Sequence, residues 1–436
     1  MSEKKEPIKV SLKVAIGLIV VLLILTAIMS MYFLNKSNKK EQPIANQLVK
    51  NEVVEENKKD VEEKVDLNIA LLKENNIKEN MIYSPLSIKY ALSMLSEGAA
   101  NKTKEQIDNL LPEKELTKYE NKENILSLAN SVFIKDTYKD KVKEEYINAL
   151  KNKYDAEFRF DDFTNANNMN DWIEEKTFGI LTDIIPDDVV KEPNAKMFLI
   201  NALAIDMEWE HTFDCADTFG QDFNKIDGTK LKAAMMHKKT ASENVKYIAN
   251  DELTAVSMNL GVYEEEEENI LEFVAIMPKE IELEKYIKEF TTEKYEEIID
   301  ELTPASDAKD GISLAIPRFD YDHQIPLVEN LQKLGMQDAF NQVMADFSKM
   351  ADTQLYVNDA IHKADIEFNE EGTKAAAVTV LMMFESMAIM EETKPVSVVF
   401  DNPFLYFIRD IKTGEVWFVG TVYEPVAWED VANDYR

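Results

Sequence analysis

Residues 370–379, with the sequence EEGTKAAAVT, form a run of small side chains near the end of the chain, and their setting decides the fold. The stretch VLMMFESMAIMEETKP follows directly as residues 380–395, and neither stretch carries a hairpin signal such as Asn-Gly. Local propensity is consistent with a helix start, because two acidic residues precede an alanine run. The role of the run must therefore be inferred from the sequence around it.

Short runs rich in β-branched and aromatic residues lie on both sides of this segment and predict strands. They are residues 196–209, 270–280, 311–321, 396–410 and 415–425. Apolar residues at helical spacing predict helices, mostly earlier in the chain, where Ser84 is placed to cap a helix and Pro85 suits its first turn. The predicted helices cover residues 66–76, 86–99, 101–111 and 327–336. Helices early and strands late indicate one α+β domain.

The composition supports a large core and excludes some classes of partner. Of 436 residues, 45% are hydrophobic, which is ample for a globular domain. The 49 basic and 82 acidic residues give a net charge of −33, so the long-range field repels nucleic acids and anionic lipid head groups. The single cysteine, Cys215, cannot form an internal disulfide. We expect an inert small residue there, with a catalytic thiol as the less favoured alternative.

Residues 14–34, VAIGLIVVLLILTAIMSMYFL, contain no charged residue and predict a transmembrane helix. Such a helix would be about 31 Å long, which matches the hydrocarbon thickness of a bilayer. The run is longer than the apolar region of a signal peptide and lacks an Ala-x-Ala cleavage site, so we expect an uncleaved anchor. Four lysines precede the span and three follow it closely, and this small excess predicts an N-terminus inside the cell.

The expected organisation is a single-pass protein of the cell membrane with its folded domain outside the cell. Residues 1–13 are the predicted cytoplasmic segment, 35–60 a polar linker, 61–425 the folded domain and 426–436 a C-terminal tail. The acidic run at residues 264–268 is expected to be a solvated loop tip, with a cation site as the alternative. We expect a monomer. Abundant Lys, Glu, Asn and Ile is typical of a prokaryote with an A/T-rich genome.

No motif for catalysis or cofactor binding is present, so an enzyme is not expected. The four histidines are His211, His237, His323 and His362, and none of them forms an HExxH or other close pair suited to zinc. Nucleophile elbows, phosphate loops and dinucleotide fingerprints are missing from the sequence, which has only 11 glycines. A glycosidase-like carboxylate pair could not be recognised among 82 acids and stays open as an alternative. We expect neither a metal nor a cofactor.

Several blocks of the chain resemble the serpin family of protease inhibitors in their order and spacing. On the C-terminal side they are IPRFDYDHQIPLVENLQKLGMQDAF (316–340), ADFSKM (345–350), AIHKADIEFNEEGTKAAAVT (360–379) and DNPFLYFIRDIKTGEVWFVGTVYEP (401–425). The earlier blocks are YSPLSIKYALSMLSEGAANKT (83–103), NALAIDMEW (201–209) and KAAMMHKK (232–239). The resemblance spans residues 62–425.

The resemblance implies a fold of three β-sheets with eight or nine helices and an exposed reactive loop that a protease attacks as a substrate. It also implies that the cut loop inserts into the central sheet as a new strand and traps the protease as an acyl-enzyme. Alternate side chains of a strand face opposite sides, so one set must enter the packed layer beneath the sheet. The core-facing set is uniformly small: Thr373, Ala375, Ala377 and Thr379. Small residues let the sheet open with little steric cost.

The resemblance assigns the role of a hinge to the run quoted first. The hinge residues are Glu370, Glu371, Gly372, Thr373, Lys374, Ala375, Ala376, Ala377, Val378 and Thr379. Family members that have lost inhibition commonly carry charged, bulky or proline residues in the inserting set, and this chain does not. A suicide-substrate inhibitor is therefore predicted. A noninhibitory, membrane-tethered binding or structural protein is the alternative.

The bond cut in the family usually follows the residue fourteen positions after the hinge glycine. That count predicts Ser386 and Met387 as the reactive bond, with Met383 and Phe384 as alternatives because the loop is longer than in many relatives. No Arg or Lys occurs in residues 376–392, so a trypsin-like protease finds no basic anchor there. The predicted targets are serine proteases with apolar or small pockets, of subtilisin, elastase or chymotrypsin type. Cysteine proteases stay open as an alternative.

Polar residues of the chain match the family's hydrogen-bonded cluster beneath the central sheet. The matching residues are Ser84, Ser87, Asn201 and His362. We expect this cluster to act as a latch whose bonds exchange when the sheet opens, with satisfied core polar groups that only stabilise the native state as the less favoured alternative. Trp209 and Glu370 match the place where the loop first enters, and core packing explains Trp209 equally well.

Overall fold

The computed structural model describes residues 65–112, 114–123, 125–261, 271–373 and 394–433. The chain divides into two units, Met1–Glu62 and Glu63–Arg436, and every described residue belongs to the second. No helix in this described part is long and apolar enough to cross a membrane. The predicted transmembrane helix at residues 14–34 and the acidic run at residues 264–268 lie outside the described residues.

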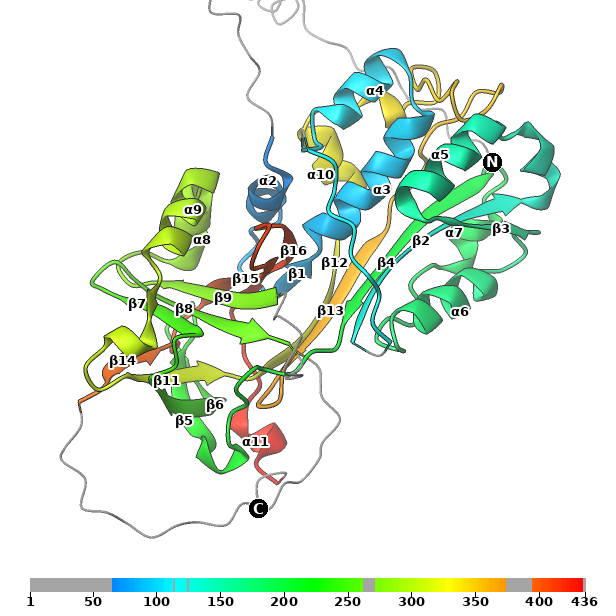
Figure 1. The fold of residues 1–436 in the computed structure, drawn as a ribbon. Helices are drawn as coiled ribbons and strands as arrows, with labels where there is room; N and C mark the ends of the chain where they lie inside the picture. The colour runs from blue at the N-terminus through cyan, green and yellow to red at the C-terminus, as the bar shows by residue number, and fades with distance from the viewer. Residues whose placement is uncertain (1–64, 113, 124, 262–270, 374–393, 434–436) are drawn as a thin grey trace, which may run out of the picture. The chain divides into compact units, whose positions relative to one another are not determined.

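Four hydrogen-bonded sheets organise the described residues (Figure 1). The largest has the strand order β1 (Met81–Tyr83), β16 (Val416–Val422), β15 (Phe404–Asp410), β9 (Leu271–Pro278), β8 (Leu253–Leu260), β7 (Val245–Ala249) and β10 (Thr303–Pro304). The second has the order β14 (Val396–Val399), β11 (Ile312–Pro317), β6 (Lys230–Thr240) and β5 (Thr218–Asn224). The third consists of β3 (Glu157–Asp161), β2 (Leu126–Lys135) and β4 (Met197–Ile205), and the fourth of β12 (Phe319–Ile325) and β13 (His362–Phe368).

The α-helices of the described part run from α2 to α11. They are α2 (Leu67–Glu74), α3 (Pro85–Gly98), α4 (Asn101–Asp108), α5 (Glu144–Tyr154), α6 (Asn167–Lys176), α7 (Asp187–Lys191), α8 (Leu283–Glu289), α9 (Thr292–Glu301), α10 (Leu327–Lys333) and α11 (Trp428–Val431). The expectation of three sheets and eight or nine helices is therefore corrected for the described residues to four sheets and ten α-helices. The extra sheet arises because β4 and β13 are not hydrogen-bonded to each other.

The predicted elements are confirmed, two of them with a subdivision. The run 311–321 breaks at Arg318 into β11 and β12, and the run 396–410 breaks before Pro403 into β14 and β15. The predicted start of α3 is confirmed as well. The Ser84 Oγ atom accepts the backbone N–H of Ser87 at 3.0 Å, and Pro85 occupies the first helical position, where its missing N–H costs nothing.

The alternation of β9 explains why the domain has separate cores on the two faces of its largest sheet. All of β9 is buried, as its uninterrupted apolar sequence suggests. Val274 and Ile276 face one hydrophobic cluster, which includes Ile287 of α8. The alternate residues Phe273 and Ala275 face a second cluster. Successive strand residues point to opposite faces, so one strand serves both cores.

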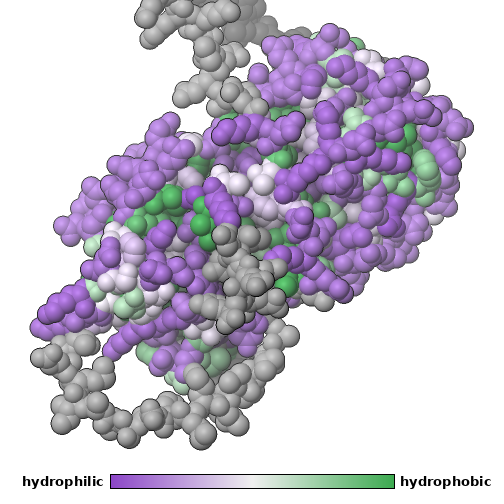
Figure 2. Space-filling model, viewed as in Figure 1, coloured by the Kyte–Doolittle hydropathy of each residue, from purple (hydrophilic) through white to green (hydrophobic). Residues whose placement is uncertain are grey.

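The face of the molecule in Figure 2 is mostly hydrophilic, with hydrophobic residues in small groups between the polar ones. The large hydrophobic side chains that are exposed in the described part lie apart along the sequence, except for the neighbours Val343 and Met344. Scattered apolar side chains are normal on a soluble surface and need no partner.

Candidate functional site

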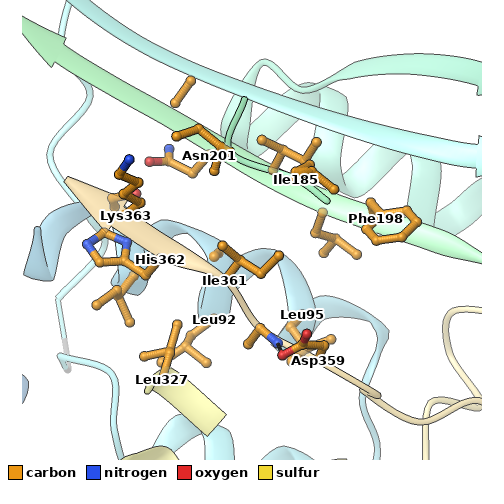
Figure 3. A pocket seen from close by; sticks show the side chains of 18 of the residues that line it. Leu92, Leu95, Ile185, Phe198, Asn201, Leu327, Asp359, Ile361, His362 and Lys363 are labelled. Atoms are coloured by element: carbon orange, nitrogen blue, oxygen red, sulfur yellow. Dashed lines mark hydrogen bonds between the residues drawn. The ribbon is translucent and has the colours of Figure 1, made fainter. Parts of the chain in front are cut away.

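A hollow of about 440 Å³ separates β4 from β13, and we call it the strand gap. One side is lined by β4 and the residues just before it, and the other by β13 and residues 358–361. Figure 3 shows the two strands facing each other across the gap, with Leu92 and Leu95 of α3 beneath them. Within the described residues, β4 pairs only with β2 and β13 only with β12. Each strand therefore turns an unpaired edge toward the gap.

His362 begins β13 and is fixed by the start of α3. Its Nε2 atom accepts the backbone N–H of Ser84 at 2.9 Å. The Ser84 hydroxyl in turn accepts the N–H of Ser87, so these three predicted cluster residues lie together. Burial lowers the pKa of His362 to about 4, because a charged imidazole would lose its hydration. The ring is therefore neutral at pH 7, which its role as an acceptor also requires.

Asn201, the fourth cluster residue, lies on β4 at the opposite side of the gap (Figure 3). Its Nδ2 atom donates to Asn130 Oδ1 on β2 at 2.9 Å. Its Oδ1 atom is buried and accepts no hydrogen bond from any described residue. A buried acceptor without a donor costs about 1–3 kcal/mol. The structure thus separates the predicted cluster into a His362 group and an Asn201 group, and the second has an unused acceptor.

The described part of the predicted hinge pairs with the chain that leaves β4. The N–H of Trp209 donates to Glu371 O at 2.7 Å, and the N–H of Thr373 donates to Met207 O at 3.0 Å. Gly372 forms an antiparallel bridge with Glu208 between these two bonds. Thr373 itself lines the strand gap. The backbone therefore arrives at the mouth of the gap already aligned as a strand beside β4.

Gly372 is required by the closeness of this pairing. A Cβ atom at this position would overlap Met207 O and stand 2.7 Å from Glu208 Cα. Both atoms belong to the backbone, so no side chain can move aside to make room. Asn369 supports the same turn, because its Oδ1 atom accepts the N–H groups of Glu371 at 2.9 Å and Gly372 at 3.2 Å.

Glu370 is a buried carboxylate that fastens the hinge to the second sheet. Its Oε1 atom accepts the hydroxyl of Thr218 on β5 at 2.6 Å. Its Oε2 atom lies 3.7 Å from Arg318 Nη1, in the turn between β11 and β12. The Glu370 side chain is 6% exposed, so the charge needs these partners. The hinge is thus held by its backbone on one side and by a charged side chain on the other.

Trp209 lies beneath the hinge and is buried. Its Nε1 atom donates to Asn369 O at 2.9 Å, and its ring packs edge-on against Phe368 with centroids 5.0 Å apart. The residue therefore packs in the core and also holds the backbone before the hinge. Thr218, Arg318, Asn369 and Asn130 complete the site and were not predicted. Asn369 could have been found, because asparagine favours such turns.

The remaining predicted site residues lie outside the described residues. They are Lys374, Ala375, Ala376, Ala377, Val378, Thr379 and the reactive-bond candidates Ser386, Met387, Met383 and Phe384. Cys215 is described and exposed. Its partial burial raises the pKa of the thiol, and the charges of Glu370 and Glu371 raise it further. A protonated thiol is a poor nucleophile, which favours the inert interpretation of Cys215.

These features define a class: an α+β domain with an unpaired gap in a sheet and a hinged arm at its mouth. The sequence model of the family "Serpin (serine protease inhibitor)" matches residues 62–425. The chain therefore belongs to the serpin family, whose general function is protease inhibition.

Individual relatives agree with this assignment. The chain is 30% identical over 366 residues to a serpin-like protein of Methanosarcina mazei, covering 80% of this chain and 82% of that protein. It is 28% identical over 384 residues to neuroserpin of Mus musculus, covering 82% and 89%. The native-state crystal structure of the thermophilic serpin tengpin has a TM-score of 0.69 and 28% identity, covering 89% of this chain and 98% of that one.

Proposed function

We propose that this serpin is a suicide-substrate inhibitor of serine proteases, and that its cut reactive loop inserts into the strand gap. One observation carries the proposal: residues 371–373 already pair with residues 207–209 beside β4, at the mouth of a gap between two unpaired strand edges. We call the part of the loop from Thr373 to the cut bond the arm. Each residue of the arm can extend this pairing along β4 without a change in the direction of the chain. The alternation of small residues in the sequence supports the same path.

The proposed chemistry begins as an ordinary acyl transfer. The protease serine attacks the carbonyl carbon of Ser386, or of an alternative residue in the same loop, and the amine of the following residue leaves with a proton. The new ester joins the arm to the protease. Hydrolysis by water would complete the reaction and release a cut loop. Insertion of the arm competes with that step, so the outcome depends on which is faster.

Insertion is favourable because the arm finds partners on both sides. Its backbone N–H and C=O groups pair with the free edges of β4 and β13, and its small side chains enter the layer above α3. The uncut chain cannot insert fully while both ends of its loop are attached, so it is kinetically trapped in the native state. An arm of about 15 residues spans roughly 50 Å as a strand. That displacement would carry the attached protease across the domain and distort its active site.

The sequence also supports proposals for the target and the location. The lack of Lys and Arg in residues 376–392 favours proteases with apolar or small pockets, of subtilisin, elastase or chymotrypsin type. The uncharged residues 14–34 favour a single membrane anchor with a monomeric inhibitor domain outside the cell. No cofactor takes part in this mechanism.

The test is to incubate the purified full chain with subtilisin and, separately, with trypsin. We expect an SDS-resistant adduct with subtilisin, and mass spectrometry should identify the acylating residue between positions 374 and 393. With trypsin no adduct should form through this segment. A loop that subtilisin cuts completely without any adduct would refute inhibition and support the noninhibitory alternative. A trypsin adduct through this segment would refute the specificity alone.

A further inference from the structure

A second hollow, of about 530 Å³, lies beside the hinge, and we call it the hinge-side hollow. Its walls are residues 208–212, the end of β6 with the following turn, and Gly261. It shares no lining residue with the strand gap. The two hollows are therefore distinct sites, although Thr373, which lines the strand gap, donates to Met207 O next to Glu208 of the hinge-side hollow.

Lys238 on β6 supplies a cation to this hollow that has no anionic partner among the described residues. Its Nζ atom donates to the backbone oxygens of His211 at 2.7 Å and Thr212 at 2.8 Å. An ammonium has three donors, and the third meets no hydrogen-bond acceptor in the described part of the chain, although the Nζ atom also lies 5.5 Å from the centroid of the Phe213 ring. No carboxylate in the described part of the chain forms an ion pair with Lys238, and burial lowers its pKa to about 8. An anion placed beside it would restore the stability of the charged form.

Two hydroxyl groups extend the donor wall. Thr240 Oγ1 accepts the backbone N–H of Ser242 at 3.1 Å, and Ser242 Oγ accepts the N–H of Asn244 at 3.1 Å. Both oxygens are therefore fixed as acceptors by short-range turns, which leaves each hydroxyl proton to donate elsewhere. Lys238, Thr240 and Ser242 all line the same hollow, whose walls therefore carry three side-chain donors.

Residues 208–212 also bring acidic side chains to this hollow. Glu210 lines it with a side chain that is only 5% exposed, and its two oxygens accept the amides of Asn244 at 2.6 Å and Asn259 at 2.9 Å. Its Oε1 atom also lies 4.0 Å from His211 Nε2. Glu208 lines the same hollow and is exposed. Two carboxylates disfavour ligands with several negative charges and attract a positive group.

We propose that the hinge-side hollow binds a small zwitterion of the α-amino acid type. Its carboxylate accepts from Lys238, Thr240 and Ser242, and its ammonium faces Glu208. Such a ligand touches residues 208–212, whose backbone also holds Glu371 through Trp209. Binding therefore stabilises the hinge in its native pairing, independently of which protease is inhibited.

The test measures binding of L-alanine to the purified full chain in non-ionic detergent by calorimetry, with sodium acetate, ethylammonium chloride and inorganic phosphate as comparison probes. Alanine is expected to bind more tightly than acetate, and ethylammonium and phosphate not to bind measurably. Absence of alanine binding, or tighter binding of phosphate or ethylammonium than of alanine, would overturn the proposal.

Lys238→Gln should weaken alanine binding by about tenfold or more, the loss expected for a charged hydrogen bond. Lys239→Gln is the matched control, because Lys239 is the next residue of β6, is exposed and does not line the hollow. Equal affinities of both variants would contradict the proposal. If Lys238→Gln does not fold, NMR titration of unsubstituted Lys238 decides: alanine should raise its pKa, and an unchanged pKa would count against the site.

Discussion

Gly372 and Met207 approach so closely that the carbonyl oxygen of Met207 occupies the space where any Cβ on Gly372 would lie. Gly372→Ala must therefore push the hinge away from the chain after β4. We expect a loss of about 1–3 kcal/mol of unfolding free energy, as for other overpacked sites. Urea unfolding of both proteins measures it. Lys239→Ala, at an exposed position of β6, is the control and should change the unfolding free energy by less than about 0.5 kcal/mol.

Thr218→Val tests the bond between the second sheet and the hinge. The substitution keeps the shape but removes the hydroxyl that Glu370 accepts at 2.6 Å. A hydrogen bond to a charged group contributes about 1.5–3 kcal/mol, and we expect a destabilisation of that size. Thr303→Val, at an exposed position, should change the unfolding free energy by less than about 0.5 kcal/mol. Equal effects of the two substitutions would mean that Glu370 needs no donor from β5.

The burial of His362 predicts a pH dependence of stability. Its folded pKa of about 4 lies below the ordinary value of 6.5, so the unfolded chain binds the proton more readily between these values. The neutral His362 ring therefore contributes fully to the free energy of unfolding above pH 6.5. This contribution, about 3 kcal/mol in total, is lost as the pH falls to about 4.

Urea unfolding between pH 7 and pH 4 measures this dependence. In the His362→Gln variant, the free energy of unfolding should fall by about 3 kcal/mol less over this pH range than in the wild type. His211→Gln is the control, because His211 is 40% exposed. Parallel profiles for the wild type and His362→Gln would contradict the assignment of this proton to His362.

Thr373→Arg should convert the proposed inhibitor into a substrate. Thr373 is buried at the mouth of the strand gap, and a bulky charged side chain there would obstruct the opening that the arm has to enter. The measurement is the fraction of subtilisin trapped per molecule of serpin cut, from SDS gels. Lys374→Arg is the matched control, since a strand inserted with residue 373 facing inward would place residue 374 on the outward face. Undiminished trapping by Thr373→Arg would remove the basis for the insertion path.

Cleavage of the reactive loop should itself stabilise the protein. An inserted arm adds backbone hydrogen bonds along two strands, and we expect the melting temperature to rise by more than about 10 °C. Calorimetry of the chain before and after limited subtilisin digestion tests this rise. The cut Thr373→Arg variant should show a much smaller increase. A cut wild type that melts no higher than the intact chain would contradict insertion.

The sequence predicted single elements well because their signals are local. Ser84 and Pro85 mark the start of α3 by capping chemistry, and the apolar run of β9 marks a strand buried on both faces. The position of the hinge followed from a family resemblance, and only its first four residues are described.

Long-range pairings could not be predicted in the same way. Thr218 and Glu370 are 152 positions apart in the sequence, and the residues around each of them give no indication of the hydrogen bond between them. The separation of β4 from β13 is likewise a relation between two strands that each look complete alone. Because the two strands are separate, Asn201 lies across the gap from His362 and not beside it, as the expected cluster would have required.

Ser84 uses its backbone N–H for His362 and its hydroxyl for the first turn of α3, so one residue ties a strand edge to a helix end. That helix also packs against β4. Any widening of the sheet must therefore carry the helix along with β13, fray its first turn or break the hydrogen bond between Ser84 and His362. For the insertion proposed above, we therefore expect the rate to depend in part on the strength of a helix cap.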